Sequence, residues 1–197
     1  MAHALDFLSN APENMEKYIF IDESGLNLHL HLTMARSKIV LPTVCGRNVS
    51  LVAAMSAYGI IHTEIIDDGT CNDTKFCVFI RKLVAILLQK EHLNCSWLII
   101  DNARIHKTEE LREIFSNSPY ELKFLSPYYY MLNPIENVFS KVKLSVRSVL
   151  GQRVSGQTLS FMIEKGVRTV TQEVCTNYVM NVTRKLSAAA SGQPMAT

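Results

Sequence analysis

Two short runs of this sequence share one pattern, an apolar β-strand that stops at an aspartate. "YIFID" ends at Asp22 and "WLIID" ends at Asp101. Strand-forming residues fill both runs and turn-like residues follow them, so we predict that each aspartate stands at the C-terminal end of its strand. Ligands of α/β proteins bind beside such strand ends. If the two strands are neighbours, the sequence therefore predicts two carboxylates at one site.

The remaining strand signals predict a mixed sheet. Within "NVSLVAAMSAYGIIHTEIID", two apolar runs at about 49–57 and 60–66 flank Gly59, which favours two antiparallel strands after the first. Another strand is expected at 121–125. Strands followed by alternating helices and strands indicate an α/β fold with a five-stranded mixed sheet, three strands antiparallel and two parallel, flanked by helices.

Apolar residues recur every three or four positions from 72 to 90, which predicts a helix with Asn72 or Asp73 as its N-cap. Further helices are expected at about 108–117, 134–149 and 157–187, the last with Gly166 as a weak point. The sequence thus divides into an N-terminal extension (1–17), one α/β domain (18–150), a C-terminal helical segment (151–187) and a flexible tail (188–197).

Composition excludes several classes of protein. The chain is 48% hydrophobic and 19% charged, which is ordinary for a globular protein. No apolar run reaches the roughly 18 residues that span a membrane, and the N-terminus lacks a signal-peptide pattern, so we expect an intracellular protein without membrane contact. Five cysteines form no C-x-x-C pair, which favours reduced thiols over a zinc site or a disulfide framework.

Charge is unevenly distributed along the chain. Residues 137–197 carry eight Lys or Arg against two Glu, a local balance of +6, although the whole chain is only +2. The first 136 residues are therefore at −4. This asymmetry predicts a basic surface beside an acidic centre, as suits a polyanion held near a metal site, and solvated helix faces explain it equally well.

A third carboxylate, Glu136, lies in "LNPIENVFSK". On the predicted helix it adjoins the apolar stripe through Ile135 and Phe139, so it can reach the rim of a buried face. Asn133-x-x-Glu136 also has the spacing of a capping box, and that spacing alone favours a helix cap. Two strand-end aspartates followed after 34 residues by this glutamate favour a magnesium site instead, because Mg²⁺ prefers hard carboxylate ligands.

At these positions the sequence resembles the catalytic domain of DDE transposases of the mariner and Tc-like group. The matching strings are "FIDESG", "IIDNARIHK" and "FLSPYYYMLNPIENVFSKVK", and the resemblance covers about Tyr18 to Arg147. It implies a ribonuclease H-like fold and metal-dependent DNA cleavage and strand transfer. It also implies two Mg²⁺ ions, with Mn²⁺ as a substitute, held by the catalytic residues Asp22, Asp101 and Glu136.

Other residues near these strings have expected roles and ordinary alternatives. By the resemblance, His106 could approach DNA or the metal site in a supporting role, and a surface histidine is the plain alternative. Asn102 could orient Asp101 or simply close a turn, and the sequence favours neither. Basic residues after the glutamate would contact DNA phosphates, or else they are solvated helix side chains. These basic residues are Lys141, Lys143 and Arg147.

The resemblance also implies partners and leaves one alternative function open. DNA is the expected substrate, with a second copy of the chain or a full-length transposase as protein partner, and the nucleus as the location in a eukaryote. The alternative is an inactive or domesticated remnant that binds DNA or a partner. It is motivated by the 17 residues before Tyr18, too few for paired helix-turn-helix domains, and by the tyrosine loop 128–130.

Overall fold

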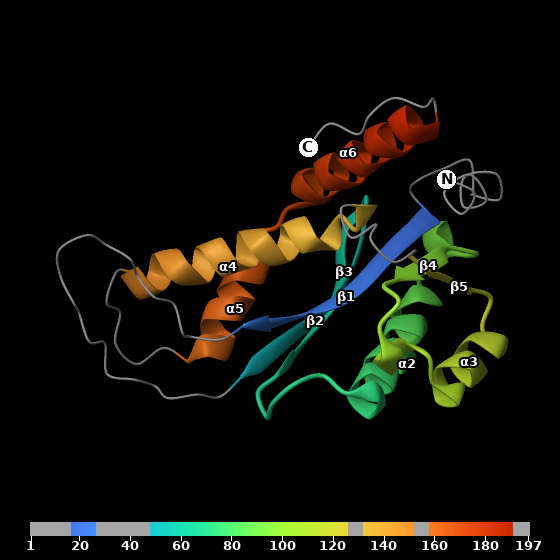
Figure 1. Ribbon diagram of the computed structural model, residues 1–197, viewed down its shortest axis with the longest axis horizontal. Helices are drawn as coiled ribbons and strands as arrows, with labels where there is room; N and C mark the ends of the chain where they lie inside the picture. Colours follow the sequence, from blue (N-terminus) through green and yellow to red (C-terminus); the bar gives the residue numbers. More distant parts are fainter. Residues whose placement is uncertain (1–16, 27–47, 126–131, 152–157, 191–197) are drawn as a thin grey trace.

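A five-stranded sheet forms the centre of the computed structural model, which describes residues 17–26, 48–125, 132–151 and 158–190 (Figure 1). Its spatial order is β3-β2-β1-β4-β5. The strands are β1 (Tyr18–Leu26), β2 (Val49–Ser56), β3 (Gly59–Ile66), β4 (Trp97–Ile100) and β5 (Glu121–Phe124). Antiparallel pairing joins β1, β2 and β3, whereas β4 and β5 run parallel to β1. The predicted mixed sheet is confirmed.

Helices cover the sheet on both sides. They are α2 (Asp73–Leu87), α3 (Glu109–Ser116), α4 (Ile135–Gly151), α5 (Leu159–Arg168) and α6 (Gln172–Ala190), with two short 3₁₀ helices, η2 (Glu91–Leu93) and η3 (Arg104–His106). Side chains cap the starts of several of these helices. Asn72 accepts from the Lys75 N–H at α2, and Thr108 accepts from the Leu111 N–H at α3. Asn72 is thus the N-cap of α2.

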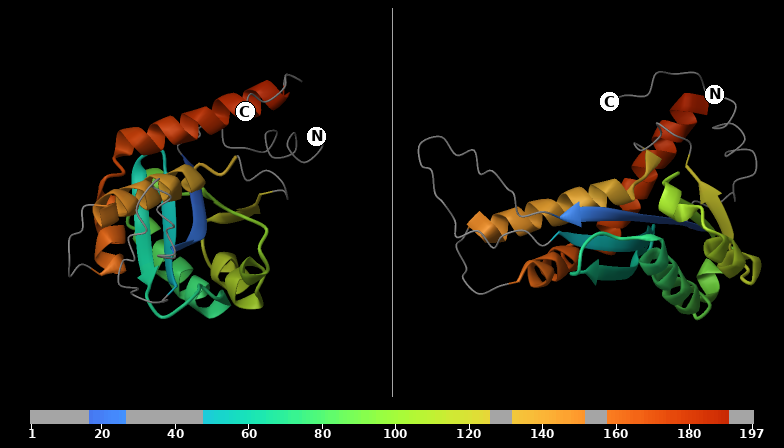
Figure 2. Two further views of the ribbon diagram at one scale, coloured as in Figure 1. Left: turned by 60° about the vertical axis from the view of Figure 1, so that its left-hand side comes forward. Right: turned by 60° about the horizontal axis from the view of Figure 1, so that its bottom comes forward.

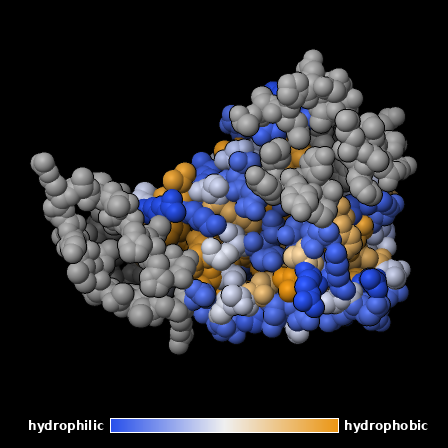
Figure 3. Space-filling view, viewed as in Figure 1, coloured by the Kyte–Doolittle hydropathy of each residue, from blue (hydrophilic) through white to orange (hydrophobic). Residues whose placement is uncertain are grey.

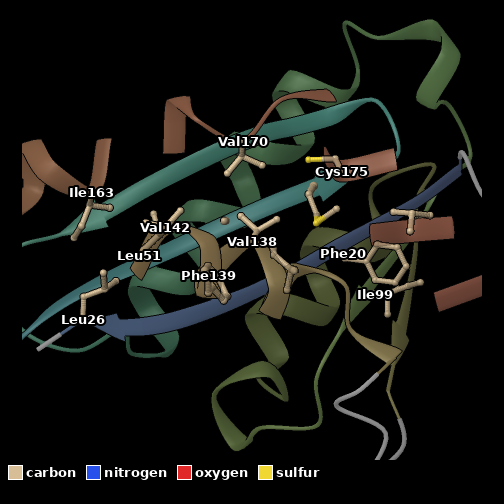
Figure 4. Close-up of a cluster of buried hydrophobic side chains, with 14 of the residues drawn as sticks. Phe20, Leu26, Leu51, Ile99, Val138, Phe139, Val142, Ile163, Val170 and Cys175 are labelled. Carbon is tan, nitrogen blue, oxygen red and sulfur yellow. The ribbon is translucent and has the colours of Figure 1, made fainter. Parts of the chain in front are cut away.

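Alternation along β1 divides the core into two layers. Tyr18 and Phe20 pack with α4, α5 and α6 on one face of the sheet. Ile19 and Ile21 pack with α2 and α3 on the other face. Figure 2 shows α4 and α2 on opposite sides of the strands, and Figure 4 shows Phe139 of α4 above them. Side chains two residues apart on a strand share a face, so these layers decide which way each polar residue of β1 points.

The predicted helix over 157–187 is wrong in one respect, since it forms two helices. The break falls at Thr169–Thr171 rather than at Gly166. Thr171 accepts from the Val174 N–H through its hydroxyl, and this side-chain bond starts α6. Gly166 is instead a point of close approach between α5 and α4, where an added Cβ would lie 3.1 Å from Val142 Cγ1.

Several predictions fall partly outside the described residues. The tyrosine loop 128–130, most of the N-terminal extension and residues 191–197 of the predicted tail lie there, while α6 extends to Ala190. None of the helices in the described ranges combines the length and apolar character that crossing a bilayer requires. The side of the molecule seen in Figure 3 is mostly hydrophilic where it is described, with scattered apolar patches.

Gly166 provides a test of the α4–α5 contact. We expect Gly166→Ala to lower the free energy of unfolding by about 1 kcal/mol, although alanine has the higher helix propensity. The new methyl group would lie 3.3 Å from the Val142 carbonyl oxygen, which cannot move without the helix backbone. Urea denaturation measures the change. The exposed neighbour Glu164→Ala is the control, and a gain in stability for Gly166→Ala would contradict the close approach.

Candidate active site

Asp22 lies in the middle of β1, so the prediction that it ends its strand is wrong. The strand continues to Leu26 because antiparallel pairing with β2 continues, with Asp22 opposite Ala53 and Glu23 opposite Val52. Polar residues in "ESG" gave a turn-like pattern, but pairing with β2 continues through all three residues, and the Glu23 N–H donates to Asp22 Oδ1. Asp22 is therefore held by a strand on one side, and only 7% of its surface is exposed.

On its other side β1 loses its neighbour near Asp22. Phe20 pairs with Ile99 in parallel register, and two further residues on each strand bring Asp22 level with Asp101. There β4 has already ended, at Ile100. The two aspartates thus stand where two parallel strands separate, which is the ligand-binding position that the sequence pattern predicted.

Strand alternation places Asp22 on the same face as Tyr18 and Phe20, which is the face covered by α4. Glu136 is in the first turn of this helix. Its side chain is exposed, and its negative charge acts on Asp22. The structure therefore brings the helix glutamate to the side of the sheet where Asp22 points.

Asn133 does not act as the side-chain cap that the capping-box spacing suggests. Its Nδ2 donates to Asp22 Oδ2 at 2.8 Å, while the Glu136 N–H donates to the Asn133 backbone oxygen. No bond from the Glu136 carboxylate back to the Asn133 backbone is present among the described residues. The entry of α4 is thus fastened to β1 through a carboxylate. Nothing in the sequence around Asn133 predicted its bond to Asp22.

His106 joins Asp101 to the strand β1. It is fully buried, with Nδ1 2.7 Å from Asp101 Oδ1 and Nε2 3.1 Å from Glu23 Oε2, and its ring lies 4.2 Å from that of Phe76. Glu23 reaches it because neighbouring residues of a strand face opposite sides. Asn102 is exposed, and the backbone N–H that donates to Asp101 Oδ1 comes from Ala103.

Electrostatics differ sharply between the two aspartates. Burial raises the pKa of Asp22 to about 7, and the negative charges of Glu23, Asp101 and Glu136 add to the rise. The hydrogen bond from His106 instead lowers the pKa of Asp101 below its ordinary value. Burial would lower the pKa of His106, but its bonds to Asp101 and Glu23 outweigh this effect and raise it to about 9.

The residues present fit a divalent cation. Asp22 accepts one protein donor on each oxygen, from Glu23 N and from Asn133 Nδ2, and each oxygen keeps a second lone pair. Uncompensated negative charge around Asp22 would be relieved by a cation. In the described part of the chain, no three His, Cys, Asp or Glu side chains already converge as a closed metal cage. An open set with few protein ligands is what Mg²⁺ commonly uses.

The three basic residues expected to contact DNA lie on α4 in two directions. At 100° per residue, Lys143 and Arg147 come within about 20° of Glu136 around the helix, whereas Lys141 is about 140° away. Arg147 is exposed and Lys143 is half-buried. Lys143 and Arg147 therefore extend from Glu136 along one face of the helix.

Solved structures of Mos1 transposase share the fold of this chain. The catalytic domain of Mos1 mariner transposase has a TM-score of 0.66 at 13% identity, covering 99% of this chain and 91% of that one. The Mos1 paired end complexes with Mn and with Mg have TM-scores of 0.68 and 0.67 at 12% identity. They cover 97% and 100% of this chain, which spans only 59% and 60% of theirs.

These likenesses show that the fold is ribonuclease H-like, as the resemblance predicted. No curated protein matches the sequence at a significant level. The family model described as DDE superfamily endonuclease matches residues 17–155, which include β1, β4 and the start of α4. The chain belongs to the DDE superfamily endonuclease family.

Proposed function

We propose that this chain is the catalytic domain of a DNA transposase that cleaves DNA and transfers strands with two divalent cations, Mg²⁺ or Mn²⁺. Asp22 and Asp101 are the main ligands, and Glu136 completes the site from α4. The observation that carries the proposal is the β1–β4 register, which brings Asp22 level with Asp101 beneath the helix that bears Glu136.

Each residue has a role that follows from its surroundings. Asp22 is rigid, because β2 holds its backbone and Asn133 holds its carboxylate. Asp101 is kept ionised at neutral pH by protonated His106, whose Nδ1 fixes one of its oxygens. Glu136 is exposed and reaches the site from the solvent side, where DNA would approach.

The chemistry is phosphodiester hydrolysis followed by transesterification. In the first step water adds to phosphorus and the bond to the 3′ oxygen breaks, which frees a 3′-hydroxyl. In the second step that hydroxyl attacks another phosphodiester, so one P–O bond replaces another. When bound, the cations lower the pKa of the attacking water or hydroxyl and stabilise the leaving oxygen. This chain contributes the carboxylates that fix their positions.

DNA and protein partners follow from the same proposal. Lys143 and Arg147 extend along α4 from Glu136 and would contact phosphates on either side of the cleaved bond. Partners are DNA and either a second copy of the chain or a longer transposase. Action on chromosomal DNA takes place inside the cell, and in the nucleus of a eukaryote.

Glu136→Gln is the sharpest test of the site. The carboxylate makes no hydrogen bond or ion pair with the described residues, so its loss should leave the free energy of unfolding within about 0.5 kcal/mol. We expect Mg²⁺-dependent nicking of supercoiled DNA to fall at least 100-fold. Glu164→Gln, an exposed glutamate of α5, is the matched control and should nick like wild type. Equal nicking by Glu136→Gln would remove Glu136 from the site.

Asp101→Asn tests the second strand. We expect it to abolish Mg²⁺-dependent nicking while circular dichroism shows an intact fold. A wild-type protein that binds neither Mg²⁺ nor Mn²⁺ in a calorimetric titration would instead favour the non-catalytic remnant. The two results are distinguishable, since the titration needs no DNA.

Asp22 predicts a pH dependence of the metal-free protein. Folding raises its pKa from 3.8 to about 7, so the folded state holds the proton more tightly than the unfolded state. This contribution to stability is complete below about pH 4 and is lost as the pH rises through about 7. Between these values the stability difference between wild type and Asp22→Asn should change by on the order of 4 kcal/mol. Urea denaturation in EDTA measures it, and a constant difference would contradict the buried carboxylate.

The direction of the basic residues predicts which of them bind DNA. Lys143→Ala and Arg147→Ala should each weaken binding and reduce the slope of log K against log salt by about 1. Lys141→Ala, on the other side of the helix, should change the slope far less and serves as the control. Fluorescence anisotropy in a salt series measures all three. Equal slopes for the three variants would contradict the alignment with Glu136.

A further inference from the structure

The side-chain amide of Asn133 makes a hydrogen bond through its nitrogen and, among the described residues, none through its oxygen. Its side chain is 3% exposed, and its Nδ2 donates to Asp22 Oδ2 at 2.8 Å. Its Oδ1 is buried and accepts no hydrogen bond in the described part of the chain. Tyr120 Oη is the other such atom there, and it belongs to the opposite core layer. An unsatisfied buried amide oxygen costs about 1–3 kcal/mol, so it calls for an explanation.

Local capping does not explain the Oδ1 atom. An asparagine before a helix commonly accepts from a backbone N–H of the first turn, as Asn72 does with Lys75 at 2.9 Å. At α4 the Glu136 N–H goes to the backbone oxygen of Asn133 instead. The amide has turned away from its own helix toward Asp22, and Oδ1 belongs to the same amide group that bonds this carboxylate.

The surroundings of Oδ1 select the chemistry of its partner. An amide oxygen only accepts hydrogen bonds, so its missing partner must be a donor. The ionised carboxylates of Asp22, Asp101 and Glu136 cannot supply one, because they too only accept. The donor must therefore come from a group that is stable next to negative charge. Water in the hydration shell of a divalent cation has this character, because the cation strengthens its O–H donors and Mg²⁺ keeps several waters. The oxygen shares one rigid amide plane with Nδ2, which already touches Asp22, so its donor lies next to that carboxylate.

We infer that Asn133 is a positioning residue of the metal site: its Nδ2 orients Asp22, and its Oδ1 accepts a hydrogen bond from a water molecule on the cation that Asp22 binds. The inference rests on the proposed function and deepens it. It makes the entry of α4 a part of the site, so that one turn of the chain supplies both a positioning amide and the ligand Glu136.

A purely structural tie between α4 and β1 is the competing explanation. It predicts that loss of Asn133 lowers stability and nothing else. Positioning predicts weaker cation binding as well, by about 10- to 100-fold, the usual effect of removing a group that orients a metal ligand. The two explanations are therefore separated by a binding measurement without DNA.

The test uses the full chain with Asn133→Ala and Asn133→Leu, the second of which keeps most of the side-chain volume. Mn²⁺ affinity is measured from the electron paramagnetic resonance signal of free Mn²⁺. We expect both variants to bind about 10- to 100-fold more weakly than wild type. In nicking assays kcat should fall while KM for DNA stays unchanged, since Asn133 is buried and acts through the cation site.

Asn72→Ala is the matched control, because it removes a helix-entry asparagine of the same chain whose side chain caps its own helix instead of bonding a carboxylate. It should unfold at a lower urea concentration, as cap removal does, and bind Mn²⁺ like wild type. Wild-type Mn²⁺ affinity in both Asn133 variants would overturn the inference and leave the proposed function intact. Loss of the fold in both variants would assign Asn133 to structure alone and overturn it too. Absence of Mn²⁺ binding by wild type would overturn the proposed function and the inference with it.

Discussion

Parallel pairing of β1 with β4 is the constraint on which the rest of the structure depends. The register sets Phe20 opposite Ile99, and it leaves Asp22 and Asp101 level at the point where β4 ends. A slip of one residue would turn Asp22 to the other face and bury Ile21 against α4 instead. Because both faces of the sheet are packed with apolar side chains, such a slip would disrupt two cores at once. Folding stability and site geometry are therefore specified by the same contacts.

His106 connects the two faces of the sheet at this point. Strand alternation sends Asp22 toward α4 and Glu23 toward α2, so adjacent carboxylates of β1 serve different layers. His106, packed against Phe76 of α2, bonds Glu23 and Asp101 together. His106, on the α2 face of the sheet, thus holds Asp101, while Asn133, on the α4 face, holds Asp22. The candidate site therefore combines residues of β1, the end of β4, η3, α2 and the start of α4.

Much of this arrangement follows from sequence patterns, and the failures have physical causes. Apolar runs before Asp22 and Asp101 predicted the two buried strands β1 and β4, because burial of a parallel sheet requires such runs. They could not show that β1 continues past Asp22, since pairing with β2 is a long-range contact that overrides the turn propensity of "DESG". Capping propensity likewise favoured a local role for Asn133, and the distant Asp22 provided the stronger partner. Both wrong predictions concern polar residues that bond a partner far away in the sequence, which local propensity does not include.

The negative charges of Asp101 and Glu23 have a cationic partner, whereas those of Asp22 and Glu136 have none among the described residues. His106 lies between Asp101 and Glu23 and balances both. Burial of Asp22 near these like charges disfavours its ionised form, which is why its pKa rises while that of Asp101 falls. A chain selected for stability alone would place an apolar or amide residue at position 22. A divalent cation bound beside Asp22 would offset this cost, since the negative charges that repel one another attract the metal.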